Sequence, residues 1–102
     1  MTITSKERAE LRGEAHHLSP MVHIGHQGLT DALVQAIDDA LRTHELVKIA
    51  LVKASDVKPK DASHEIAERL GADVVQTIGR TCTIYRHNPD LKRKPGALPP
   101  WK

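Results

Sequence analysis

Apolar residues recur at helical spacing in three segments of the chain. The clearest stripe lies in residues 30–44 and consists of Leu33, Ile37 and Leu41. Residues 5–15 and 61–70 show the same spacing over shorter lengths. Because residues four apart lie on one side of an α-helix, the pattern predicts three helices, each with one apolar side.

Polar residues at the predicted helix ends support these boundaries. Thr4 and Glu7 have the spacing of a capping box, in which each side chain accepts a hydrogen bond from a free backbone N–H near the helix start. Thr30 is a favourable N-cap for the second helix. Gly71 follows the third helix at the position where glycine commonly ends one.

Four short segments are rich in apolar residues and bounded by turn residues, and we predict them as strands. They are residues 21–24, 46–53, 73–78 and 81–86. Gly79 and Arg80 separate the last two strands, which indicates a two-residue hairpin turn. A first helix followed by β-α-β-α-β-β predicts an α/β two-layer sandwich, with about four strands and the helices on one face of the sheet.

The hairpin turn also predicts which residues face one another across the last two strands. If Ile78 faces Thr81, then Val75 faces Ile84. The residues of this hairpin expected on the face covered by helices are Val75, Thr77, Cys82 and Ile84. The opposite face, which it shares with Lys48, is expected to be at least partly open to water.

Length and composition suit one compact domain with a basic tail. The chain has 102 residues, of which 39% are apolar and 27% are charged. We place the domain in residues 1–86 and expect residues 87–102, which are rich in proline and basic side chains, to form a flexible tail. A cationic tail often binds a polyanion, although a solvated chain end explains it equally well.

Composition also excludes several classes of protein. No stretch of 18 apolar residues is present, so we expect no membrane-spanning helix and no membrane partner. The N-terminus lacks the apolar region of a signal peptide, and the single cysteine indicates a reducing compartment, so a cytoplasmic location is predicted. With no Phe, one Tyr and one Trp, the chain cannot build an aromatic platform on which several bases stack.

The segment most informative about function joins the first predicted strand to the second predicted helix. It reads Gly25-His26-Gln27-Gly28-Leu29-Thr30 and contains a G-x-x-G pattern. Glycines let another chain approach the backbone, and the helix that follows offers free N–H groups and a partial positive charge to a phosphate. Such a loop clamps the nucleic-acid backbone in KH domains. The pattern alone is also explained by a tight turn that needs glycine.

A wider pattern surrounds this loop and extends over roughly residues 5–86. Its members are Leu11, residues 15–25, residues 28–30, residues 37–41, residues 44–49, Val75, Ile78, Gly79 and residues 84–86. In order and spacing it closely resembles the YhbY-type CRM-domain family of RNA-binding proteins. The resemblance implies a fold similar to the C-terminal domain of translation initiation factor three, with a KH-like glycine loop. Members are associated with precursors of the large ribosomal subunit, and related domains serve group II intron splicing in plastids.

The resemblance thus implies a non-catalytic protein that binds ribosomal RNA in large (50S) subunit precursors. The candidate RNA-binding residues are Gly25, His26, Gln27, Gly28, Leu29, Thr30, Lys48, Arg80 and Arg86. Any contribution of His26 to phosphate binding is expected to depend on pH, since imidazole is mostly neutral at pH 7. We expect Gly28→Asp to weaken RNA binding and leave the fold intact. The alternative is a protein-interaction module that uses the open sheet face and contacts RNA only incidentally.

Catalysis and metal binding are not predicted. The seven histidines form no H-E-x-x-H pattern, and a single cysteine excludes a C-x-x-C zinc site. Cys82 is expected to be a small core residue rather than a nucleophile. We therefore expect no enzyme activity, no metal, no cofactor and no small-molecule substrate, and a monomer rather than an oligomer.

Overall fold

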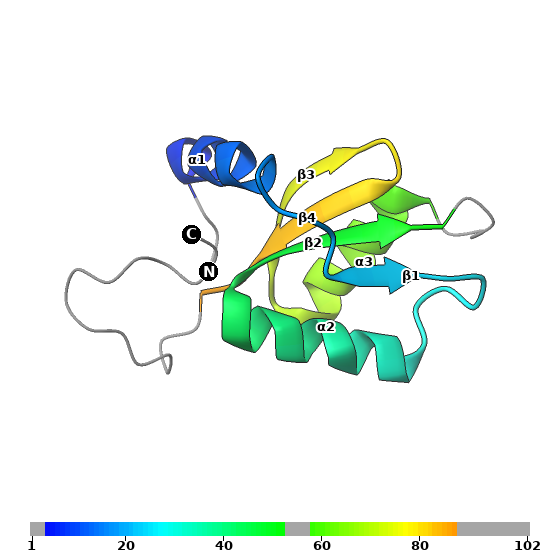
Figure 1. The fold of residues 1–102 in the computed structure, drawn as a ribbon. Helices are drawn as coiled ribbons and strands as arrows, with labels where there is room; N and C mark the ends of the chain where they lie inside the picture. Colours follow the sequence, from blue (N-terminus) through cyan, green and yellow to red (C-terminus); the bar gives the residue numbers. More distant parts are fainter. Residues whose placement is uncertain (1–3, 53–57, 88–102) are drawn as a thin grey trace.

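The computed structural model describes residues 4–52 and 58–87, which form three helices and four strands (Figure 1). In chain order these are α1 (Ser5–Ala15), β1 (Val22–Ile24), α2 (Asp31–His44), β2 (Leu46–Leu51), α3 (Pro59–Leu70), β3 (Asp73–Ile78) and β4 (Thr81–Tyr85). The sequence predicted all seven elements. Lys53, the expected end of the second strand, and the predicted tail beyond His87 lie outside the described residues.

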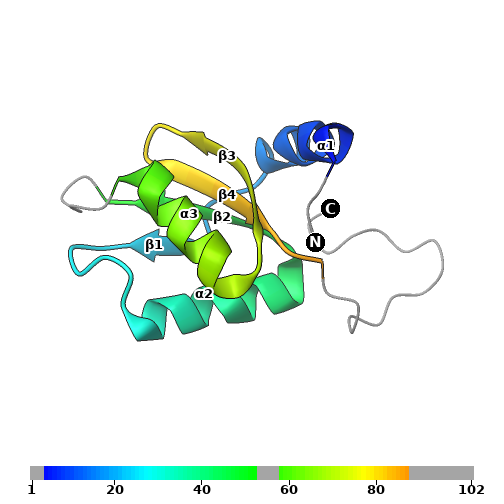
Figure 2. The ribbon, with the colours of Figure 1, turned by 180° about the vertical axis from the view of Figure 1, so that it is seen from behind.

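The strands form one mixed sheet in the order β1-β2-β4-β3. β1 and β2 run parallel and are connected through α2, whereas β4 is antiparallel to both of its neighbours. The two connecting helices, α2 and α3, cover one face of the sheet, as the crossover rule predicts (Figure 2). The first helix, α1, departs from the prediction that the helices share one face: it precedes β1 and is not part of a crossover, and it lies against the other face near one end of the sheet (Figure 1).

Two apolar clusters hold these layers together. The larger lies between the sheet and the helices α2 and α3, and its buried members are Ile24, Ile37, Leu41, Val47, Ile49, Leu51, Ala62, Ile66, Cys82 and Ile84. The smaller cluster lies beneath α1 and contains Leu11, Leu46 and Val75, with Leu18 and Tyr85 packed against it. Val47, Ile49 and Leu51 of β2 therefore face the larger cluster and Leu46 faces the smaller one, as the alternation of side chains along a strand predicts.

The predicted register of the β3–β4 hairpin is correct near the turn and wrong further along. Ile78 pairs with Thr81 and Gln76 with Thr83, as predicted, but a bulge at Val75 then makes Val74 the partner of Ile84. A bulge places two residues opposite one and turns the extra side chain. Val75 therefore packs under α1, only 3% exposed, instead of on the face covered by α2 and α3.

Two helix starts show how local chemistry sets the boundaries. At α1 the capping box is present, because Thr4 N–H donates to Glu7 Oε1 and Glu7 N–H donates to Thr4 Oγ1, both at 3.1 Å. The third helix begins at Pro59, two residues before the predicted start at Asp61. Proline suits the first helical position, where its missing N–H costs no hydrogen bond, so the segment read as loop is already helical.

Candidate nucleic-acid interface

The glycine loop connects the carboxyl end of β1 to the amino end of α2 at one end of the sheet (Figure 1). Gly28 N–H donates to Gly25 O at 3.1 Å, and Thr30 N–H donates to Gly28 O at 3.2 Å. These two bonds close a compact turn. The side chains at its tip, His26 and Gln27, are both exposed.

The turn requires glycine at one of the two glycine positions of this loop and not at the other. Gly28 is buried and has φ of 68°, in the left-handed region where other residues are strained. The φ of Gly25 lies outside that region, and a Cβ at Gly25 would meet no atom within 4 Å. The turn therefore requires glycine at position 28, whereas the fold allows a side chain at position 25.

This difference corrects the expectation for Gly28→Asp. A side chain at a buried position with φ of 68° strains the turn, so this substitution does not leave the fold untouched. Gly25 is the position at which a side chain blocks the loop surface without disturbing the turn. A glycine that the fold does not require leaves the backbone accessible for close approach by another molecule.

The start of α2 adds hydrogen-bond donors to this surface. Thr30 caps the helix, accepting the N–H of Leu33 on Oγ1 at 3.2 Å. The N–H groups of Asp31 and Ala32 belong to the first turn, which has no carbonyl partners within the helix, and the helix dipole adds partial positive charge there. The carboxylate of Asp31 lies in the same turn and offsets part of that charge.

The loop and the first turns of α2 enclose a shallow open hollow of about 360 Å³. Its lining residues are Gly25, His26, Gln27, Gly28, Thr30 and Leu33. Five of the six loop candidates thus line one surface. The sequence pattern assigned Leu33 to the core alone, and only its position one turn into the helix that follows the loop could have indicated the second role.

Lys48 lies in the middle of the sheet and completes the end of α1. Its Nζ donates to the backbone oxygens of Ala15 and Leu18, both at 3.4 Å. A cation at the carboxyl end of a helix satisfies free carbonyls and interacts favourably with the dipole. The side chain of Lys48 therefore has a structural role, and its contact with RNA stays a prediction.

Arg80 lies at the same end of the sheet as the glycine loop, in the β3–β4 turn (Figure 1). Its Nε donates to Leu51 O at 3.2 Å, and its Nη2 donates to Val52 O. These bonds hold the guanidinium against the end of β2. Of the three basic candidates, Arg80 is the one that the fold places near the loop end of the sheet.

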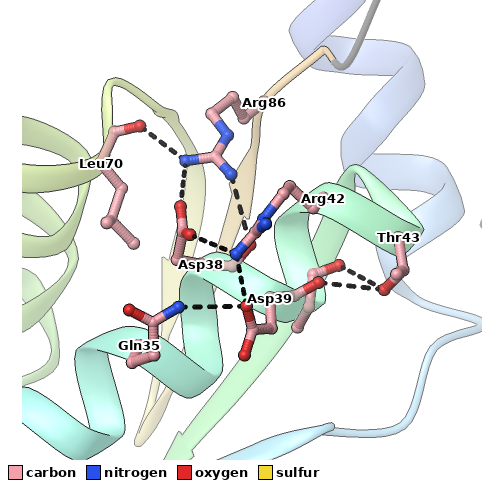
Figure 3. Close-up of polar contacts among 8 residues, drawn as sticks. Gln35, Asp38, Asp39, Arg42, Thr43, Leu70 and Arg86 are labelled. Carbon is pink, nitrogen blue, oxygen red and sulfur yellow. Dashed lines mark hydrogen bonds and ion pairs between the residues drawn. The ribbon is translucent and has the colours of Figure 1, made fainter. Parts of the chain in front are cut away.

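Arg86 lies at the opposite end of the sheet and joins three elements (Figure 3). Its Nη1 donates to Asp38 Oδ1 at 2.8 Å and to Leu70 O at 2.9 Å, and its Nη2 donates to Asp38 O at 3.3 Å. The hydrogen bond from Arg86 is the main cause that lowers the pKa of Asp38, with Arg42 adding to it. The structure does not bring Arg86 to the loop, so its RNA contact also stays a prediction.

Other sites for chemistry are limited in the described part of the chain. The Cys82 side chain is buried, and burial raises the pKa of its thiol to about 12, so the reactive thiolate is disfavoured. Among residues 4–52 and 58–87, no group of three or more His, Cys, Asp or Glu side chains is placed to hold a metal ion. Within the same residues, no helix has the length and apolar character needed to cross a membrane.

Comparison with known proteins agrees with the resemblance seen in the sequence. The chain is 30% identical over 91 residues to "Probable RNA-binding protein YqeI" of Bacillus subtilis, covering 89% of this chain and 95% of that protein. It is 35% identical over 91 residues to an "RNA-binding protein" of Haemophilus influenzae, covering 89% and 92%. The solution structure of the hypothetical protein SAV1595 from Staphylococcus aureus superimposes with a TM-score of 0.68 at 30% identity, covering 96% of this chain and all of that one. The family model of the CRS1 / YhbY (CRM) domain matches residues 3–86, and the chain therefore belongs to the CRS1/YhbY (CRM) domain family.

Proposed function

We propose that this chain is a non-catalytic RNA-binding protein that holds the backbone of structured RNA on its glycine loop. Three relatives, from Bacillus subtilis, Haemophilus influenzae and Pseudomonas aeruginosa, carry names that describe them as RNA-binding proteins or probable ones. The observation that best supports the proposal concerns Gly25. It is a glycine that the fold does not need, beside free N–H groups at the start of α2.

The chemistry of this surface suits a phosphate group. A glycine backbone permits close approach, the first turn of α2 supplies donors, and the helix dipole favours negative charge. His26 and Gln27 are exposed and add side-chain donors at the tip of the turn. Because the chain has no aromatic platform, contact depends on backbone shape and phosphate position more than on base identity.

The test is a substitution at Gly25 with a matched control at Gly13. Both glycines leave open space for a Cβ, and Gly13 lies exposed on α1, away from the loop. We expect Gly25→Asp to weaken binding to fragments of large-subunit ribosomal RNA by about tenfold or more, because a carboxylate then repels the phosphate. Gly13→Asp should bind as the unchanged protein does.

Binding is measured by fluorescence anisotropy at fixed salt, and thermal unfolding checks that both variants fold. A folded Gly25→Asp protein that binds RNA with unchanged affinity would show that the loop is not the site. Gly25→Ala adds a small side chain without charge, and its affinity for RNA should lie between those of Gly25→Asp and the unchanged protein.

We further propose that the RNA is ribosomal RNA in precursors of the large subunit, in the cytoplasm, with the protein acting as a monomer. The resemblance to the family supports this target. A tagged protein should co-sediment with large-subunit precursors on a sucrose gradient, and ribonuclease should release it. Association that survives ribonuclease would favour the alternative, a protein-interaction module.

A further inference from the structure

On the face of the sheet that carries α1, this helix covers one end, and the segment that leads from α1 to β1 crosses the strands beside it (Figure 1). The strand register divides this face into three rows. The row beneath α1 contains Leu46, Tyr85 and Asp73, the middle row contains Lys48, Thr83 and Gln76, and the last row contains His23, Ala50, Thr81 and Ile78. Thr83 in the middle row is only 1% exposed and Lys48 is hydrogen-bonded to the end of α1, so we call the last row alone the open half of the sheet.

Exposed apolar side chains lie in the open half and at its borders. Three large apolar residues of the described chain are exposed, namely Met21 at 38%, Val52 at 37% and Ile78 at 54%. Ile78 belongs to the last row. Met21 N–H donates to Lys48 O at 2.9 Å, and Val52 N–H donates to Ile24 O at 3.0 Å, so both extend the ladder at the borders of the open half.

The charges of the open half favour an anionic partner. The last row holds the exposed imidazole of His23 and no carboxylate, and Lys48 lies in the middle row beside it. The Lys48 side chain is hydrogen-bonded to the end of α1. Asp73, the one carboxylate on this face of the strands, lies in the row beneath α1.

The open half is also continuous with the glycine loop. β1 leads from His23 through Ile24 directly to Gly25, so the last row is two residues from the loop. Two residues of extended chain span at most about 7 Å. A nucleic-acid strand that lies on the loop can therefore continue onto the open half without leaving the protein surface.

We infer that the open half binds unpaired nucleotides of the same RNA whose backbone lies on the glycine loop. This inference rests on the proposed function and names its substrate class, a stem that adjoins a single-stranded segment. Bases in a duplex are stacked and paired, so only unpaired nucleotides offer their apolar faces to Ile78, Val52 and Met21. Ala50 and Thr81 are small, which lets those nucleotides approach the sheet.

The test uses two RNA probes, a hairpin with a single-stranded extension and the same hairpin with a blunt end. We expect Ile78→Asp to weaken binding of the extended probe by about tenfold and of the blunt probe by less than about twofold, because the variant loses an apolar contact and its carboxylate repels the RNA. Ile78→Thr removes the apolar contact without adding charge and should weaken binding of the extended probe by about threefold. Gly25→Asp should weaken both probes.

His64→Asp is the matched control, because His64 is exposed on α3, on the far side of the sheet. It should bind both probes as the unchanged protein does. Ile78 is more than half exposed, so its variants should fold, and thermal unfolding checks this. The preference of the unchanged protein for the extended probe is the second readout.

The outcomes separate this inference from the proposed function. If the Ile78 variants bind the extended probe normally while Gly25→Asp does not, the open half is not an RNA surface and the loop remains one. If the unchanged protein binds neither probe, the proposed function fails as well. If Ile78→Asp spares RNA binding but abolishes a ribonuclease-resistant association with subunit precursors, the open half holds a protein, and the inference is overturned.

Discussion

Arg86 is the residue that connects the most elements in the described chain. It follows β4, and its guanidinium binds Asp38 of α2 and the last carbonyl of α3, at Leu70 (Figure 3). Asp38 also accepts from Arg42 at 3.1 Å, and Arg42 reaches Asp39 at 2.6 Å. The result is a charged network that joins the two covering helices to the sheet.

The lowered pKa of Asp38 predicts how stability depends on pH. A carboxyl group whose pKa is lower in the folded state stabilises the fold above its ordinary value of 3.8 and loses that contribution as pH falls through the folded pKa. We expect Asp38→Asn to reduce the free energy of unfolding at pH 7 by about 1–2 kcal/mol. The difference from the unchanged protein should shrink as the pH falls below about 4, because Asp38 of the unfolded chain then binds a proton, and it should vanish once the pH is below the lowered pKa of the folded state.

Urea unfolding at several pH values measures this difference. Asp39→Asn is the matched control, because Asp39 is 60% exposed and pairs with Arg42 but not with Arg86. Asp39→Asn should lower the free energy of unfolding by less than about 0.5 kcal/mol, which is the contribution typical of an exposed ion pair. A deficit of Asp38→Asn that stays constant from pH 7 to pH 3 would contradict an origin in the carboxylate.

At the scale of the elements, local sequence predicted most of the fold. The apolar stripe and Thr30 cap of α2, and the glycine loop before it, depend on neighbours within a few residues and could be read directly. The bulge at Val75 could not, because it depends on Leu11 and Leu46 needing an apolar partner beneath α1. Tertiary packing there decides which way a strand residue turns.

The candidate site also has a part that the sequence predicts and a part that it does not. The loop residues were predicted as a group and line one hollow, because they are consecutive in the chain. The basic residues could not be placed, since their partners are distant in sequence. Lys48 reaches back to Ala15 and Leu18, and Arg86 reaches back to Asp38. A basic residue in a matched segment can therefore serve the fold, which spacing alone does not reveal.

The contact between Lys48 and the end of α1 gives a prediction at this scale. We expect Lys48→Met to lower the free energy of unfolding by about 1 kcal/mol, because the last carbonyls of α1 lose their cation while the apolar stem is kept. RNA affinity should fall by no more than about threefold, since the ammonium adds to the field of the open half without binding a phosphate itself.

Chemical denaturation and anisotropy measure the two effects in parallel. Lys60→Met is the matched control, because Lys60 is exposed at the start of α3, and it should change stability little. If Lys48→Met instead weakens RNA binding as much as Gly25→Asp and leaves stability unchanged, Lys48 is a direct phosphate ligand and its bonds to α1 are secondary.

At the scale of the whole molecule, the candidate loop and the C-terminal end of the described chain lie at opposite ends of the sheet. The glycine loop and Arg80 lie at one end of the sheet, and the chain leaves the other end after Arg86 (Figure 1). His87 is held there, because its Nδ1 lies 3.0 Å from Oε2 of the buried Glu45. Glu45 has φ of 64° and its backbone oxygen accepts the N–H of Arg86 at 2.9 Å, so it fixes where the chain departs.

This arrangement sharpens the prediction for the basic tail. Residues 88–102 hold four basic side chains, Lys92, Arg93, Lys94 and Lys102, against the single acid Asp90. The tail follows β4 at the end of the sheet opposite the loop, so its removal leaves the loop surface unchanged. Truncation after His87 keeps the pair with Glu45, so the domain should unfold at an unchanged temperature while its affinity for RNA falls.

The dependence on salt separates the tail from the loop. Each phosphate neutralised contributes about 0.7 to 0.9 to the slope of log affinity against log salt, so loss of four contacts should reduce the slope by about 3. Gly25→Asp should lower affinity at every salt concentration and change the slope by less than about 1. A full-length variant with Gln at positions 92, 93 and 94 should reproduce most of the effect of truncation. If that variant keeps the slope of the unchanged protein, the tail acts through something other than its charge, and the loop with the open half accounts for the electrostatic part of binding.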